Sequence, residues 1–312
     1  MTRVLIGYDG SEDANAAIAV AGDLFKGAET VVVTVYPPPP TMETGAMARV
    51  ALPDAMIREG IERMRAEVEQ RAHATVEEGV ERARAAGLDA APATITGLSA
   101  WRNLRDKAEE LGSDVVVCGT RGEGRLERVV VGSTASSLLY HADRPMLIVP
   151  AGSVPGDGPI IAGYDDSDGA RGALRFAAAH LAERRLVVTH AWRSPVRHTV
   201  RGRAIMHAGV DVLAEYADAV DTIYEESAQD VANEGAEFAR ELGLVADIAA
   251  PESGQGAWQT LLAEAREAGA AAILVGSRGR GAVTSTVLGS VASGLVHAAA
   301  LPVIVVPGSA PR

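Results

Sequence analysis

The stretch Val115-Val-Val-Cys-Gly-Thr-Arg-Gly122, followed after nine residues by Gly132-Ser133, indicates the fold of this chain. Its apolar run has the composition of a buried strand, and the segment after Gly132 has that of a helix. Glycine at a strand-to-helix junction lets the backbone approach another group closely, and phosphate is the usual candidate there. The stretch therefore predicts an α/β fold with an anion-binding loop.

The same stretch occurs a second time. Ala272-Ile-Leu-Val275 precedes Gly276-Ser-Arg-Gly279, and Gly289-Ser290 again follows after nine residues. The similarity extends to the first strand of each copy, where VLIGYDGS (residues 4–11) matches IIAGYDDS (residues 160–167). The length of 312 residues also suits two domains. We therefore expect a first domain over 1–150, a glycine- and proline-rich linker over 151–158 and a second domain over 159–312.

Each half alternates short aliphatic runs with amphipathic segments. In the first half the strands are expected at about 3–8, 31–36, 92–96, 114–119 and 146–150, and the helices at about 13–25, 55–86, 100–111 and 133–141. Such alternation predicts a parallel sheet that is covered on both faces. With right-handed crossovers, each half becomes a doubly wound domain with five parallel strands.

Composition excludes several classes of function. The net charge of −12 argues against sequence-independent binding of DNA or RNA, which depends on lysine and arginine. No window of 18 uninterrupted apolar residues predicts a membrane span, and the first residues do not resemble a signal peptide, so a cytoplasmic protein is expected. The single cysteine, Cys118, lies in an apolar run and is expected to be a buried hydrophobe rather than a reactive thiol.

The topology predicts where a ligand would bind. In a doubly wound sheet, ligands bind at the carboxyl ends of strands whose connections diverge. If the first and fourth strands are neighbours, Asp9 meets the loop from Gly119 to Ser133 there. Gly119 and Gly122 would leave room for a phosphate, and Gly132-Ser133 would open a helix whose N–H groups favour an anion. The Ser133 hydroxyl would either cap that helix or donate to the phosphate.

Four charged residues have more than one interpretation. Arg121 and Arg278 would bring positive charge to the phosphates, or they are solvated surface residues. Asp9 and Asp165 would accept hydrogen bonds from ribose hydroxyls or help to hold a metal ion, or they are helix caps.

Several catalytic motifs are missing from the sequence. Neither lysine stands in the P-loop pattern, and no serine is the centre of Gly-x-Ser-x-Gly. The seven histidines show no metal-binding spacing. We therefore expect a protein that is not an enzyme.

The doubled pattern resembles the universal stress protein family, in its tandem two-domain form and its ATP-binding subtype, whose signature is Gly-x2-Gly-x9-Gly-(Ser/Thr). The resemblance implies five parallel strands in the order 3-2-1-4-5 and ATP at the ends of strands one and four. Carried onto this sequence, the implied contacts are Asp9, Val35, Gly119, Gly122, Gly132 and Ser133 in the first half, and Asp165, Ala191, Gly276, Gly279, Gly289 and Ser290 in the second. Val35 and Ala191 would contact adenine.

The second half departs from the first at two of these places. Asp166 replaces Gly10, which puts an extra carboxylate near the expected site, and Ala191 replaces Val35, which gives the base a smaller contact. The prediction of a nucleotide site is therefore slightly better supported in the first half than in the second.

The function that follows is that of a nucleotide-dependent regulator in the stress response, which holds ATP, with or without Mg, and does not hydrolyse it rapidly. One alternative is a slow ATPase or a nucleotide-dependent transferase that uses the same site. Another is an interaction module that kept only the fold, which two intact glycine signatures disfavour. The expected partners are ATP and an unidentified protein. We also expect the halves to pack through their last strands and whole chains to pair as a homodimer.

Overall fold

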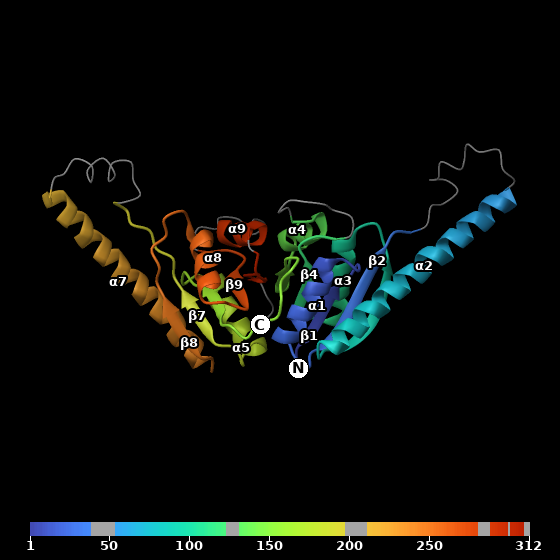
Figure 1. The fold of residues 1–312 in the computed structure, drawn as a ribbon, viewed down its shortest axis with the longest axis horizontal. Helices are drawn as coiled ribbons and strands as arrows, with labels where there is room; N and C mark the ends of the chain where they lie inside the picture. The colour runs from blue at the N-terminus through green and yellow to red at the C-terminus, as the bar shows by residue number, and fades with distance from the viewer. Residues whose placement is uncertain (39–53, 123–130, 197–210, 280–287, 299, 309–312) are drawn as a thin grey trace.

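The computed structural model describes residues 1–38, 54–122, 131–196, 211–279, 288–298 and 300–308. Strands and helices alternate along both halves (Figure 1). The first half contains β1 (Arg3–Gly7), α1 (Glu12–Leu24), β2 (Glu29–Tyr36), α2 (Asp54–Ala85), β3 (Asp89–Thr96), α3 (Ala100–Leu111), β4 (Val115–Gly119), α4 (Ser133–Tyr140) and β5 (Met146–Val149). The second contains β6 (Ile160–Gly163), α5 (Asp168–His180), β7 (Leu186–Thr189), α7 (Asp211–Glu241), β8 (Ala246–Ala249), α8 (Ala257–Glu267), β9 (Ala272–Gly276), α9 (Ser290–Ala298) and β10 (Val303–Val306).

The ten strands of the described residues form one sheet, in the order β3-β2-β1-β4-β5-β10-β9-β6-β7-β8. Within each half, all neighbouring strands are parallel. The predicted order 3-2-1-4-5 is confirmed in the first half and recurs in the second. The halves meet where β5 and β10 pair in antiparallel fashion, with Leu147 opposite Ile304. The predicted packing through the last strands is therefore present as a continuous sheet, which leaves neither strand as an exposed edge.

The hydrophobic core is divided by the sheet rather than by the two halves. On one face α1, α2, α5 and α7 bury aliphatic residues against side chains such as Val4 and Ile6. On the other face α3, α4, α8 and α9 pack against buried strand residues such as Leu5 and Ile161. Successive strand residues point to opposite faces, so nearly continuous aliphatic strands supply both cores. Figure 1 shows α2 and α7 at the two outer ends of the molecule.

One predicted boundary is wrong. The strand expected at 92–96 begins at Asp89 and pairs with β2 over eight residues. Pro92 therefore lies within the strand rather than at its start, although proline lacks a backbone N–H and normally interrupts a strand. The position is tolerated because β3 is the edge strand of the sheet.

Candidate functional site

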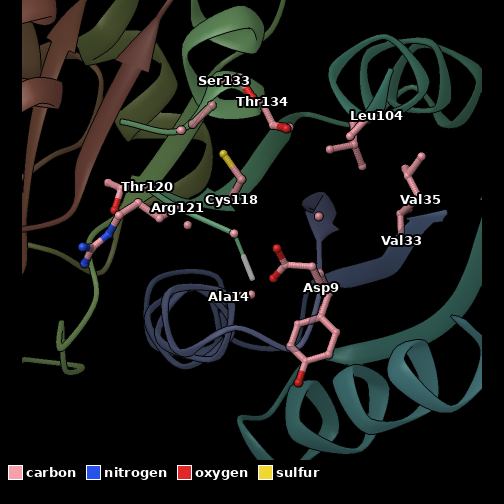
Figure 2. Close-up of a pocket in the computed structure, with 17 residues that line it drawn as sticks. Asp9, Ala14, Val33, Val35, Leu104, Cys118, Thr120, Arg121, Ser133 and Thr134 are labelled. Carbon is pink, nitrogen blue, oxygen red and sulfur yellow. The ribbon is translucent and has the colours of Figure 1, made fainter. Parts of the chain in front are cut away.

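A cavity of about 370 Å³ lies at the carboxyl ends of β1, β2 and β4, between α3 and the beginning of α4 (Figure 2). This is the edge at which the strand order predicts a ligand site. The structure brings together all the residues expected at the site in the first half, and these line the cavity: Asp9, Val35, Gly119, Arg121, Gly122, Gly132 and Ser133.

Asp9 lies at the turn between β1 and α1. Its Oδ1 accepts a hydrogen bond from the backbone N–H of Ser11 at 3.1 Å. Ser11 is the N-cap of α1, and its side chain accepts from the N–H of Ala14 at 3.2 Å. The helix-cap interpretation of Asp9 is therefore wrong, because the next serine has that role. The Asp9 carboxylate lines the cavity instead.

The loop glycines lie against other parts of the protein. A Cβ atom on Gly122 would lie 2.5 Å from Asp9 Oδ2, and one on Gly119 would lie 2.5 Å from Asp13 Cβ and 2.8 Å from its carbonyl carbon. At Gly132 the nearest atom, Thr120 O, would be 3.2 Å away. Helix α1 thus requires glycine at position 119, whereas a side chain at position 122 would displace only the end of the Asp9 side chain.

Asp13 was missed by the sequence reasoning. It is 5% exposed, and its Oδ2 accepts from Thr120 Oγ1 at 2.5 Å and from the N–H of Arg121 at 3.0 Å. Arg121 Nε lies 3.5 Å from the same oxygen. In Figure 2 the Arg121 guanidinium points away from the centre of the pocket. An acidic residue in the first turn of a helix is common, so the sequence carried no signal of this contact.

One side of the cavity is apolar. Val33 and Val35 of β2 lie there with Leu104 of α3, opposite Arg121 in Figure 2. Val33 could have been found from the alternation of side chains along β2, since it is two residues before Val35. Cys118 also lines the cavity. Burial, with a smaller contribution from the Asp9 charge, raises the pKa of the Cys118 thiol to about 12, which agrees with the expected unreactive residue.

The helix that begins at Ser133 follows a glycine cap. Gly132 is the N-cap of α4, and no side chain caps this end of the helix. Ser133 is therefore the first helical residue, beside the cavity, and the capping role that was one interpretation of its hydroxyl is not observed. The first backbone N–H groups of an α-helix have no partner within the helix, so this end favours an anion.

The second half repeats much of this geometry. Asp165 Oδ1 accepts from the N–H of Ser167 at 3.2 Å, and Ser167 caps α5, so Asp165 is not the cap either. A Cβ atom on Gly279 would collide with Asp165 Oδ2. Other predicted residues lie at the ends of the equivalent elements: Gly276 ends β9, Arg278 and Gly279 follow it, Gly289 precedes α9, and Ser290 begins α9. Ala191 differs from its counterpart Val35, because it lies two residues after the end of β7 rather than within the strand.

The extra carboxylate of the second half is part of an ion pair. Asp166 has φ of 61°, the left-handed conformation that its counterpart Gly10 also adopts. Its Oδ1 accepts from Arg171 Nε at 3.0 Å and from the Tyr164 hydroxyl at 3.2 Å. Arg171 therefore offsets the negative charge that the sequence comparison placed beside the second site.

Two negative observations concern the described residues only. Among them, no group of three or more His, Cys, Asp or Glu side chains could hold a metal ion. No helix in the described parts of the chain is long and apolar enough to cross a membrane.

Comparison with known proteins places these observations in a family. The model of the Universal stress protein family matches residues 1–150 and 158–307. A universal stress protein of Mycolicibacterium smegmatis (strain ATCC 700084 / mc(2)155) is 31% identical over 218 residues, which cover 67% of this chain and 66% of that protein. One from Mycobacterium tuberculosis (strain ATCC 25618 / H37Rv) is 28% identical over 199 residues, 61% of this chain and 62% of that one. The match thus spans about six tenths of this curated relative.

A solved structure supports the fold over almost the whole length. The crystal structure of a universal stress protein from Archaeoglobus fulgidus DSM 4304 covers 98% of this chain and 98% of its own, with a TM-score of 0.58 and 20% sequence identity. At this identity the likeness concerns the fold alone. The two matches of the family model, over residues 1–150 and 158–307, show that the chain belongs to the universal stress protein family, as a tandem of two such domains.

Proposed function

We propose that this protein is an ATP-binding regulator of the stress response, which holds the nucleotide in the first-half cavity and in the equivalent place of the second half. The observation that carries the proposal is the composition of the cavity. An apolar side, formed by Val33, Val35 and Leu104, lies opposite a glycine loop and a helix N-terminus. Its volume of about 370 Å³ lies within the range of small-molecule sites.

The two sides of the cavity suit the two ends of a nucleotide. The adenine ring would pack on Val35 and, in the second half, on Ala191. The phosphates would accept from backbone N–H groups of the glycine loop and the start of α4, and from the Ser133 hydroxyl. Asp9 would accept from the ribose hydroxyls, or it would share a Mg²⁺ ion that arrives with the phosphates.

The same groups argue for retention of ATP rather than rapid turnover. Fast phosphoryl transfer needs an aligned water, a base and neutralisation of the charge on the transferring group. Glycine amides and a serine hydroxyl would bind ground-state phosphate and Asp9 would bind the ribose, but these groups do not activate water. Turnover should therefore be far below the roughly 1–100 per second typical of kinases. A slow ATPase or nucleotide-dependent transferase is the alternative.

The setting of the function is also part of the proposal. We expect the protein to act in the cytoplasm, as a homodimer of whole chains, through a protein partner that responds to nucleotide occupancy. The net charge of −12 makes nucleic acid an improbable partner.

Nucleotide content tests the proposal directly. The purified protein is denatured and the released ligand is identified by chromatography, after which the stripped protein is titrated calorimetrically with ATP and with GTP. We expect bound adenine nucleotide, up to two ATP per chain and weaker binding of GTP. Equal binding of ATP and GTP, or binding of neither, would contradict the adenine site.

A phosphate-release assay separates the regulator from the enzyme. The unmodified chain is compared with the Asp9→Ala/Asp165→Ala double variant, and we expect very slow release from both. Rapid release that disappears in the double variant would favour the enzyme.

A further inference from the structure

The two halves differ at one residue that contacts the glycine loop. Two residues after the serine that caps the first helix of each half, the first half has Asp13 and the second has Gly169. Both positions lie against the loop that contains the first two signature glycines. The glycine loop therefore has a neighbouring carboxylate at this position in the first half and none at this position in the second half.

In the first half Asp13 engages the loop through one oxygen. Its Oδ2 accepts from Thr120 Oγ1 at 2.5 Å and from the backbone N–H of Arg121 at 3.0 Å, and Arg121 Nε lies 3.5 Å away. The side chain of Asp13 is 8% exposed, so solvent screens its charge weakly. Asp13 thus occupies a loop N–H group and attracts a guanidinium, both of which a phosphate would otherwise attract.

In the second half the equivalent contact is between backbones. A Cβ atom at Gly169 would collide with the carbonyl oxygen of Arg278, and a Cβ atom at Gly276 would lie 2.5 Å from the carbonyl carbon of Gly169. Glycine has no side chain, so no carboxylate from this position competes for the N–H group or the guanidinium of Arg278. Asp166, the extra carboxylate of this half, is paired with Arg171 and does not replace Asp13.

We propose that Asp13 makes the two sites differ in the number of phosphates that they prefer, so that the second half favours ATP over AMP more strongly than the first half does. The inference rests on the proposed function, because it concerns the same nucleotide sites. Each added phosphate brings negative charge toward the loop. In the first half the buried Asp13 carboxylate repels that charge and already attracts the arginine of the loop. In the second half no carboxylate from the equivalent position, Gly169, repels the added charge.

The two sites can be compared in the full-length chain after one of them has been blocked. Gly122→Leu blocks the first site and Gly279→Leu the second, and a calorimetric stoichiometry of one nucleotide per chain verifies each block. Titration with AMP, ADP and ATP then gives the ratio of ATP to AMP affinity for each site. We expect this ratio to be about tenfold higher for the second site, because one partly screened charge interaction changes a binding constant by about that factor.

A substitution at Asp13 tests whether its charge causes the difference between the ATP to AMP ratios of the two sites. In the Gly279→Leu background, Asp13→Asn keeps the size of the side chain and removes the charge, and should raise the ATP to AMP ratio of the first site by about tenfold. Glu12→Gln is the matched control, because Glu12 is the exposed acidic neighbour on the same helical turn. It should leave the ratio unchanged.

Each outcome separates the inference from the function on which it rests. If the unmodified chain binds no adenine nucleotide, the proposed function fails. If it binds, but the two isolated sites have equal ratios, the inference is overturned. It is also overturned if Asp13→Asn changes AMP and ATP affinity equally, since Asp13 would then act through loop shape. Should Asp13→Asn fail to fold, the comparison of the two isolated sites still decides.

Discussion

At the scale of single residues, Asp9 interacts with the start of α1, with the glycine loop and with Cys118. Its Oδ1 fixes the start of α1 through the N–H of Ser11, and its Oδ2 faces the place where a Cβ of Gly122 would be. Its charge also contributes to the raised pKa of Cys118. A short carboxylate at the end of β1 thus links the first strand, the first helix and the glycine loop.

Cys118 should report on occupancy of this site. Because the pKa of its thiol is about 12, only roughly 1 thiol in 10,000 is ionised at pH 8, so a disulfide reagent should label it slowly. Its side chain lines the cavity, and we expect ATP to slow the labelling further. The measurement is the rate of thionitrobenzoate release with and without ATP.

Denatured protein provides the control for this experiment, since its thiol should react at the ordinary rate. As Cys118 is the only cysteine of the chain, no other thiol contributes to the signal. Fast labelling of the native protein that ATP does not change would place Cys118 outside the ligand site.

At the scale of elements, the contact between α1 and the glycine loop explains why the two loop glycines are not equivalent. Gly119 faces the backbone of α1 at Asp13, which cannot move without moving the helix. Gly122 faces only the carboxylate of Asp9, at the end of a side chain. The first glycine therefore serves the fold, and the second serves the position of a site residue.

We expect Gly119→Ala and Gly122→Ala to have different effects. Gly119→Ala forces a methyl group against α1 and should lower the free energy of unfolding by about 1–3 kcal/mol. Gly122→Ala should displace the Asp9 carboxylate and weaken ATP binding at the first site by about tenfold or more, with little loss of stability. Urea denaturation and calorimetry measure the two effects.

The matched control for this pair is the second site of the same chain. Gly122→Ala should leave one ATP bound per chain with unchanged affinity. If it also lowered the unfolding free energy as much as Gly119→Ala, Gly122 would serve the fold rather than the site.

The elements also show how far the sequence could predict the structure. The strands followed from the aliphatic runs, and their order followed from the resemblance. Asp9 and the glycines were found because motif residues at strand ends converge on one edge. The start of β3 at Asp89 was missed, because Asp89-Ala-Ala-Pro92 lacks the large aliphatic side chains by which the other strands were found. The contact of Asp13 with Thr120 joins residues 107 positions apart and leaves no local pattern.

At the scale of the whole molecule, the halves are joined by more than the pairing of β5 with β10. Helices α1 and α5 face each other on one side of the sheet, where the rings of Phe25 and Phe176 lie 6.5 Å apart in an edge-to-face arrangement. Arg184 and Asp23 form an ion pair of 2.7 Å across the same contact. The two sites therefore belong to one folded unit, in which each half contributes to the packing of the other.

His180 should make the stability of this contact depend on pH. It is half-buried at the end of α5, its Nδ1 lies 3.1 Å from Thr2 Oγ1 of the first half, and its ring lies 4.8 Å from that of Phe176. Burial lowers its pKa below the usual 6.5, and the positive N-terminus adds to this, while the charge of Asp114 acts in the opposite direction. His180 is thus held neutral in the folded protein over a range of pH in which the unfolded chain binds a proton.

The sign of the effect follows from proton linkage. Because the unfolded chain takes up the proton first, the contribution of His180 to stability is complete above about pH 6.5 and is lost as the pH falls below that value toward the lower folded pKa. We expect the unmodified protein to lose more unfolding free energy between pH 7 and pH 5 than His180→Gln, which cannot be protonated. His73→Gln, at an exposed position of α2, is the control and should behave as the unmodified protein does. Urea denaturation at pH 5, 6 and 7 measures the difference, and parallel pH profiles for the unmodified protein and His180→Gln would show that protonation of this residue does not act on the contact between the halves.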